Sequence, residues 1–197
     1  MPRTGYTSDQ LLELILGFAE ETIREAGFKN LKLNQLGNRL GVSHAALYKH
    51  VSSKEALLDL VSERWLLKID EKLRSISMES IPAYDLLMKW FITYHKLKVE
   101  KVRKDPEIYK TFNMSVEKKK DFVQTHLKEL KNQLTKIVKR GKDENMFKRF
   151  STKETVNLLM EGATSFHHPF LVAESKDENR IKVLKDLIDT MVQGFNT

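Results

Sequence analysis

The apolar residues of this chain recur every three or four positions along nearly its whole length. This period places them on one face of a helix, whereas a half-buried strand would alternate apolar and polar residues. The first stripe contains Leu11, Ile15 and Phe18. Thr7 and Gln10 precede it with the spacing of a capping box, a common start of a helix. The pattern predicts an all-α protein.

Two short helices joined by a tight turn follow the first stripe. Leu33, Leu36 and Leu40 form the apolar face of the first of these helices. Gly41 stands where a helix ends in a left-handed residue, and Ser43 is a good N-cap for the second helix. This is the helix-turn-helix arrangement, whose second helix enters the major groove of DNA.

The residue types around the second helix suit contact with DNA. Ala45 and Ala46 are small enough for the helix to approach base edges closely. Tyr48, Lys49 and His50 offer hydrogen-bond donors to phosphates. The complete set of candidate DNA-contacting residues is Ser43, His44, Ala45, Ala46, Tyr48, Lys49, His50 and Lys54.

Lys54 is included because it begins the next helix. Ser52 and Glu55 have capping-box spacing, so we expect Lys54 in a first turn, beside exposed N–H groups that favour an anion. The distribution of charge along the sequence also supports this region as a DNA-contacting surface. The chain has a net charge of +7, and residues 28–54 carry five Lys or Arg side chains and no carboxylate. Such a stretch is typical of a surface that binds a polyanion.

The segment GVSHAALYKHVSSKEALL resembles the signature of the TetR family of bacterial regulators. The matching residues are Gly41, Val42, Ser43, Leu47, Tyr48, His50, Ser53, Lys54, Glu55 and Leu57. The chain departs from the family pattern at Val51, where Phe is usual, and at Leu33 and Gly37, where Thr and Ala are common. Leu33 lacks the hydroxyl with which a Thr there would cap the helix and touch phosphate.

The resemblance implies a homodimeric regulator of two domains. It places a three-helix DNA-binding domain at residues 1–53 and a larger helical effector-binding and dimerisation domain at 54–197. Such a protein would be a repressor that a small molecule releases from a palindromic operator on double-stranded DNA. The helix from Lys54 to about Ser75 is expected to be the only link between the domains. The alternative is an all-helical enzyme or a protein–protein adaptor that retains the helix-turn-helix as packing.

Aromatic and histidine side chains of the C-terminal region are either core or the lining of an effector pocket. The candidate pocket residues are Trp65, Phe91, Tyr94, His95, His126 and Phe166. The histidines, with His167 and His168, show no metal-ligand spacing, so we expect no metal and no cofactor. Two basic runs are interpreted as solvated faces, with an anion site as the alternative: Lys96, Lys98, Lys101, Arg103 and Lys104, and then Lys118 to Lys120. No catalytic motif indicates an enzyme.

The last helix has a narrow apolar seam typical of helix–helix packing. The resemblance implies that the last two helices form a four-helix bundle with a second chain; packing within one chain is the alternative. The candidate interface residues are Ala163, Phe166, Ile181, Leu184, Ile188 and Met191.

Other expectations concern the remaining helices and the cellular compartment. We expect one helix over residues 116–140 capped by Gly141, and another from Ser151 through Phe170. The chain has no cysteine, no apolar leader and no apolar run long enough to span a membrane. A soluble cytoplasmic protein is therefore expected, without a membrane partner.

Overall fold

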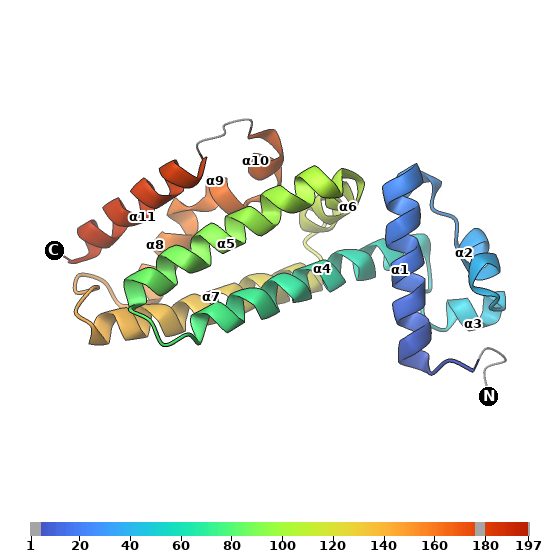
Figure 1. The fold of residues 1–197 in the computed structure, drawn as a ribbon, viewed down its shortest axis with the longest axis horizontal. Coiled ribbons are helices and arrows are strands. Elements are labelled where there is room, and N and C mark those ends of the chain that lie inside the picture. Colours follow the sequence, from blue (N-terminus) through green and yellow to red (C-terminus); the bar gives the residue numbers. More distant parts are fainter. Residues whose placement is uncertain (1–4, 176–179, 197) are drawn as a thin grey trace. The chain divides into compact units, whose positions relative to one another are not determined.

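The computed structural model describes residues 5–175 and 180–196, and within these ranges it contains helices and no strand (Figure 1). The prediction of an all-α fold is confirmed. In order, the elements are α1 (Ser8–Ala26), the 3-10 helix η1 (Phe28–Asn30), α2 (Leu33–Leu40), α3 (His44–Tyr48), α4 (Lys54–Ser77), α5 (Ala83–Lys104), α6 (Pro106–Glu117), α7 (Asp121–Asp143), α8 (Thr152–Gly162), α9 (Thr164–His167), α10 (Pro169–Glu174) and α11 (Arg180–Asn196).

The helices form two compact units. The first comprises the described residues up to Trp65 together with Lys104–Lys119, and the second comprises Leu66–Arg103 and the described residues from Lys120 onward. This grouping differs from a division at residue 53, because the first half of α4 and all of α6 pack in the N-terminal unit. A division of the sequence into two continuous segments does not allow for α6, which follows α5 along the chain but packs in the first unit.

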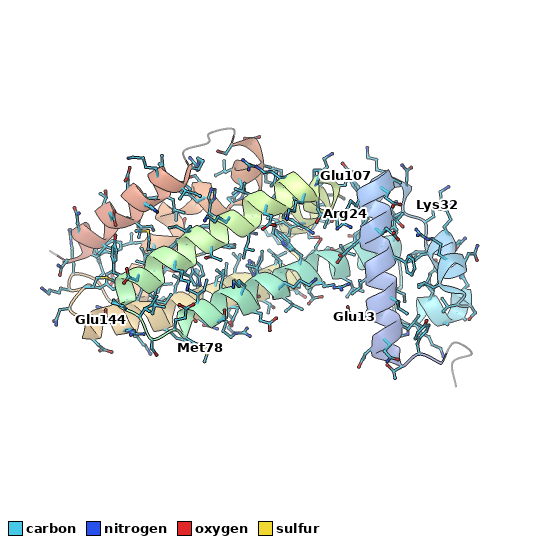
Figure 2. All side chains as sticks on the ribbon, in the orientation of Figure 1. Glu13, Arg24, Lys32, Met78, Glu107 and Glu144 are labelled. Carbon is cyan, nitrogen blue, oxygen red and sulfur yellow. The ribbon has the colours of Figure 1, made fainter. Side chains whose placement is uncertain are left out.

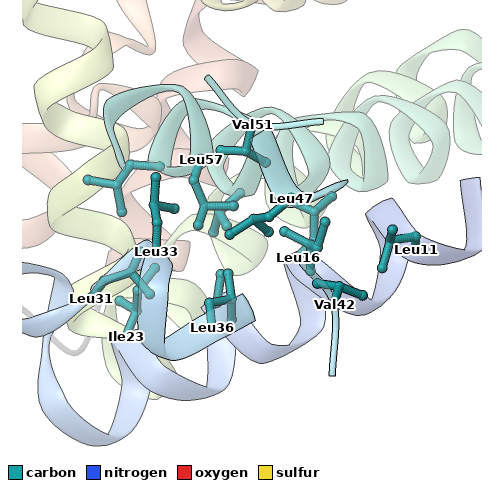
Figure 3. Close-up of a cluster of buried hydrophobic side chains, with 14 of the residues drawn as sticks. Leu11, Leu16, Ile23, Leu31, Leu33, Leu36, Val42, Leu47, Val51 and Leu57 are labelled. Carbon is teal, nitrogen blue, oxygen red and sulfur yellow. The ribbon is translucent and has the colours of Figure 1, made fainter. Parts of the chain in front are cut away.

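Leucine, isoleucine and valine side chains from α1, α2, α3 and α4 build the core of the first unit (Figure 3). Ile15, Leu47 and Leu57 are fully buried there. Burying each such side chain contributes about 1.5–3 kcal/mol, so this core is the main support of α2 and α3, which are too short to be stable alone.

Capping hydrogen bonds define where the helices of the first unit begin. The predicted box at α1 is present: the Gln10 amide N–H donates to Thr7 Oγ1 at 3.2 Å, and Gln10 Oε1 accepts from the Thr7 N–H at 3.0 Å. At α4 the prediction is wrong by one residue. Ser53 Oγ accepts from the Ala56 N–H at 3.0 Å, so Ser53 is the cap and the box from Ser52 is not formed.

Helix α6 packs against α1 in the first unit. Its Ile108 is fully buried in the same core, and Asp105 just before it accepts from Arg24 Nε on α1 at 2.5 Å. Figure 2 labels Arg24 beside Glu107, the second residue of α6. The expected DNA-binding domain, residues 1–53, is called the head below. The expectation that α4 alone links this head to the rest of the chain is therefore wrong, because α6 also contacts it.

Long helices form the second unit, and α7 packs along α8. Trp90 of α5 is fully buried, and its indole Nε1–H donates to Gln133 Oε1 of α7 at 3.0 Å. A buried indole needs such a partner because an unpaired donor in an apolar core is costly. This pair fixes α5 against α7.

Two expected helices have different bounds in the structure. The helix expected from residue 116 is interrupted, since α6 continues to Glu117 and Lys119 takes a positive φ of 51° before α7 begins. Gly141 does not cap α7 but lies inside it, against Phe147. The helix expected to continue from Ser151 through Phe170 is split into α8, α9 and α10.

We predict opposite effects for two glycine substitutions. A Cβ at Gly141 would lie 2.6 Å from Cε2 of the buried Phe147, so Gly141→Ala should lower the free energy of unfolding by about 1–3 kcal/mol. Gly17 lies within α1 with no atom near its Cβ position, so Gly17→Ala should raise it by about 0.5–1 kcal/mol. Urea denaturation measures both. A Gly141→Ala variant as stable as the parent would contradict the packing described here.

Candidate functional site

Helix α3 is a five-residue helix held by a tight turn on one side and a buried leucine on the other. Gly41 has a left-handed backbone, with φ 63° and ψ 24°, which glycine adopts without the steric cost of a Cβ. Ser43 Oγ accepts from the Ala46 N–H at 3.2 Å and caps α3 as expected. Leu47 is fully buried. The turn, the cap and the leucine together fix which face of α3 is turned outward.

The outward face of α3 carries most of the predicted DNA-contacting residues. Ala46 and His50 are half-buried, and Tyr48 is 40 % exposed. The remaining residues of the set on and around α3 are exposed: Ser43, His44, Ala45 and Lys49. The residues of the set on and around α3 are thus all at least partly accessible to a DNA partner.

Asn34 of α2 is a site residue that the sequence interpretation missed. Its Oδ1 contacts His44 Nε2 in a short hydrogen bond, and the His44 and Tyr48 rings lie 4.5 Å apart between centroids. These contacts orient His44 at the start of α3. Asn34 is ten residues away from His44, and no local pattern relates the two positions.

The basic residues of 28–54 have different surroundings. Arg39 pairs with Glu21 at 3.0 Å and lies over the Phe18 ring, 4.9 Å from its centroid. Lys54 is half-buried, and its Nζ donates to the Lys29 carbonyl at 2.6 Å, which joins the start of α4 to η1. The exposed ammonium groups of this stretch belong to Lys29, Lys32 and Lys49.

The six candidate pocket residues do not all lie in one unit. Trp65 belongs to the first unit, where its ring contacts those of Tyr109 and Phe112 at centroid distances of 5.7 and 5.0 Å. The other five are buried in the second unit: Phe91, Tyr94, His95, His126 and Phe166. His95 Nδ1 lies 2.8 Å from the Phe166 carbonyl oxygen, and burial lowers the His95 pKa.

Tyr94 and His126 belong to a buried polar cluster with Asp70, Lys98 and His167. Tyr94 Oη lies 3.3 Å from His126 Nε2, and His126 Nδ1 lies 2.6 Å from Asp70 Oδ1. The His167 ring stacks on Tyr94 with centroids 5.6 Å apart, and Lys98 Nζ lies 5.3 Å from the Tyr94 ring centroid. We call these five residues the interior cluster.

Lys98 corrects the interpretation of the basic run on α5 as a solvated face. Its side chain is 1 % exposed, whereas Lys96, two residues earlier, is exposed. Burial lowers the pKa of Lys98 to about 7, although the nearby Asp70 carboxylate opposes the shift. Lys98 follows Phe91 and Tyr94 at helical spacing, so the apolar stripe of α5 was the signal that could have placed it inside.

Within residues 5–175 and 180–196, no three His, Asp or Glu side chains are grouped as metal ligands. Among the helices of the same described part, none is both long and apolar enough to cross a bilayer.

Four of the predicted interface residues are covered within the single chain. Ala163, Leu184 and Ile188 are fully buried and Phe166 is 3 % exposed, because α11 packs on α8. Ile181 and Met191 are half-buried. Packing within one chain, the alternative for this seam, therefore already covers these four residues. The apolar side chains exposed on these two helices are instead Leu158 and Val183.

Solved structures with the same fold cover nearly the whole chain. SmeT, the repressor of the Stenotrophomonas maltophilia multidrug efflux pump SmeDEF, is 18 % identical, with a TM-score of 0.66 over 98 % of this chain and 91 % of its own. A TetR/AcrR-family regulator from Thermobifida fusca is 15 % identical, with a TM-score of 0.69 over 95 % and 99 %. A transcriptional regulator from Cytophaga hutchinsonii is 19 % identical, with a TM-score of 0.65 over 95 % and 99 %.

Two family models match separate parts of the sequence. Residues 15–61 match the model described as bacterial regulatory proteins of the tetR family, and residues 83–188 match the tetracyclin repressor-like C-terminal domain. No curated protein matches the sequence. The first match contains the helix-turn-helix, and the second alone spans more than half of the chain. The chain therefore belongs to the TetR family, whose members are DNA-binding, dimeric transcriptional regulators and not enzymes.

Proposed function

We propose that this protein is a cytoplasmic repressor that binds a palindromic operator as a homodimer and leaves it when a small molecule enters the second unit. The observation that carries the proposal is the outward face of α3, which presents His44, Ala45, Tyr48 and Lys49 in a region without carboxylates. A rigid helix with small residues at its start suits entry into a major groove.

The roles of individual residues follow from their positions on this surface. His44 and Ala45 lie in the first turn of α3, where the recognition helix of a helix-turn-helix contacts base edges. Tyr48 and Lys49 lie at its end and are exposed, which suits phosphate contacts. Lys54 adds a further ammonium group at the start of α4, where its bond to the Lys29 carbonyl leaves two N–H donors for phosphate.

Repression and release by a ligand rest on the interior of the second unit. Aromatic and ionisable side chains from several helices meet there, and ligand sites in helical bundles are built from such facing side chains. SmeT, which shares the fold, is described as a repressor of an efflux pump, and this favours repression as the mode of control here. Activation is the other mode that a regulator of this architecture would use.

We further propose that the dimer forms through the outer faces of α8 and α11. Leu158 is 40 % exposed and Val183 is 43 % exposed, so both carry apolar surface that a second chain would cover. The half-buried Met191 follows Val183 on α11 at helical spacing and would extend the contact.

The operator-binding role is tested with fluorescent DNA from upstream of the protein's own gene. We expect His44→Ala to change the order of preference among operator variants, because it removes a base contact. Lys49→Ala should weaken all sequences alike, and the slope of log K against log salt should shrink by roughly 2 for two lost phosphate contacts per dimer. Exposed Lys185 of α11 provides the control, Lys185→Ala. Wild-type protein without any sequence preference would contradict the proposed binding to a specific operator.

The dimer surface is tested by placing charges on it. Leu158→Glu and Val183→Glu should produce folded monomers with weak operator binding, because a buried carboxylate without a partner opposes association. Ile188→Glu should instead unfold the second unit, since Ile188 is fully buried within the chain. Sedimentation velocity and circular dichroism separate the two outcomes. A dimer that survives both Leu158→Glu and Val183→Glu would show that the interface lies elsewhere.

A further inference from the structure

A groove of about 400 Å³ lies between α7 and α8 of the second unit. Ligand sites in proteins are commonly clefts of about 300–1,000 Å³, so this volume is sufficient for a small molecule. Lys131 Nζ on α7 donates to Asn157 Oδ1 on α8 at 3.3 Å, and this bond joins the two walls. The lining residues are Lys131, Thr135 and Lys139 of α7 and Thr152, Lys153, Val156 and Asn157 of α8.

The side chains that line this groove are rich in hydrogen-bond donors. Three of them are lysines, none carries a carboxylate, and Val156 is the one apolar residue among them. Thr135 already donates to the Lys131 carbonyl at 2.7 Å, so the donors that a ligand would meet belong to the lysines, Thr152 and Asn157. Such a lining matches a ligand with negative charge and many acceptor oxygens, and it offers little surface to an apolar body.

The three lysines are distributed over both walls of the groove. Lys131, Thr135 and Lys139 follow one another at intervals of four residues on α7, so they lie on the same face of that helix. Lys131 and Lys139 are therefore about 12 Å apart along the helix axis. Lys153 stands on the opposite wall, in the first turn of α8, and all three lysines are exposed. A ligand that meets all three must carry several charges.

The groove lies in a strongly basic part of the chain. Residues 128–153 contain nine Lys or Arg and three Asp or Glu, so they carry a net charge of +6 in a chain whose total is +7. Two of the three carboxylates are engaged outside the groove lining. Glu129 pairs with Arg74 at 2.9 Å. Glu144 pairs with Arg140 at 3.1 Å. Like charges gathered in this way repel one another, and a bound anion relieves the repulsion.

The carboxylate that follows Lys153 in the sequence belongs to Glu154. Its Oε2 accepts from the Ser151 N–H at 2.9 Å in the capping box that begins α8. Hydrogen bonds with Ser151 lower the pKa of Glu154. This carboxylate is thus held at the helix cap rather than at the Lys153 ammonium group.

Exposed lysines select against a ligand with a single charge. One ammonium–carboxylate pair at the surface contributes little, because water screens the two charges. Several phosphates on one molecule would meet all three lysines at once, and each phosphate carries up to about two charges and three acceptor oxygens. An acid with a large apolar body is less suitable, because Val156 is the only apolar side chain in the lining.

We propose that the groove between α7 and α8 binds a small molecule that carries a short chain of phosphate groups. Lys131 and Lys139 hold the phosphates from one wall and Lys153 holds them from the other. Thr152 and Asn157 add neutral donors. A nucleotide and an inorganic polyphosphate share this chemistry, and the experiment distinguishes them. None of the interior cluster lines the groove, so the site is independent of the release by a ligand proposed above.

The test titrates ATP, GTP and inorganic triphosphate into the full-length protein by isothermal titration calorimetry, without Mg²⁺ and at low salt. At least one of them should bind saturably at submillimolar concentration. AMP should bind at least about tenfold more weakly, because its one phosphate cannot meet lysines on both walls. Added salt should weaken binding, since exposed charges are screened. Inorganic triphosphate as tight as ATP would assign the groove to phosphates alone, and tighter ATP would add contacts to the nucleoside; both results support the proposal.

Variants of the lining lysines locate the binding. Lys139→Met and Lys153→Met remove one ammonium group from each wall, so each should weaken binding about 3- to 10-fold and the double variant more than about tenfold. Lys136→Met is the matched control and should bind like the parent, because Lys136 is exposed on α7 but does not line the groove. Thermal unfolding should be unchanged in all of them, since these side chains are exposed.

Four results would each overturn the proposal. The first is no saturable binding at millimolar concentration, and the second is AMP that binds as tightly as ATP. The third is an equal loss in Lys136→Met and Lys139→Met, which would indicate general charge attraction. The fourth is binding that survives the double variant and disappears in Lys49→Ala, because the phosphates would then lie on the DNA-binding surface.

DNA binding by the same variants separates this site from other roles. Operator affinity measured without nucleotide should be unchanged in the double variant, so failure of the groove would leave the operator proposal standing. Loss of binding to a duplex of unrelated sequence in the double variant, without any nucleotide binding by the parent, would assign the groove to DNA and overturn the proposal.

Discussion

Burial of Leu47 is the interaction on which the DNA-binding surface depends. Helix α3 has only five residues, far below the length at which a helix is stable in water. Leu47 points into the first unit's core and packs beside Gly37 of α2, where a Cβ would lie at the ordinary contact distance of 3.7 Å from Leu47 Cδ2. With Leu47 fixed, helical geometry turns His44, Ala45 and Tyr48 outward. The outward orientation of those three residues therefore rests on one apolar contact behind them.

Polar contacts within the first unit add to this core. Three polar pairs join α4 to α6: Glu55 to Lys118 at 2.8 Å, Asp59 to Ser115 at 2.8 Å and Ser62 to Thr111 at 3.3 Å. Their regular spacing fixes the register of the two helices. The interior cluster takes Asp70 from α4 and Lys98 from α5, the helix that leads directly into Asp105 and α6. Helices α4 and α5 of the second unit are thus continuous in the chain with the segments that pack in the first unit.

Local signals in the sequence were sufficient for the helix-turn-helix. The bounds of α2, the left-handed Gly41 and the Ser43 cap depend on residues within one turn of each other, and all three were predicted. The interior cluster was only partly predicted, because its partners are far apart in sequence. Lys98 was assigned to solvent from its charge, although its spacing from Tyr94 placed it on the apolar stripe. The seam of α11 was assigned to a second chain, although its own chain covers most of it. Periodicity identifies a buried face without showing whether the same chain or another covers it.

The central claim is that two α3 helices read a two-fold symmetric operator. Hydroxyl-radical footprinting of the DNA upstream of the protein's own gene tests it most directly. Two protected patches should appear on one face of the duplex, related by two-fold symmetry and centred about 34–36 Å apart or a multiple of that distance. A single asymmetric patch, or uniform protection that disappears with added salt, would contradict the claim.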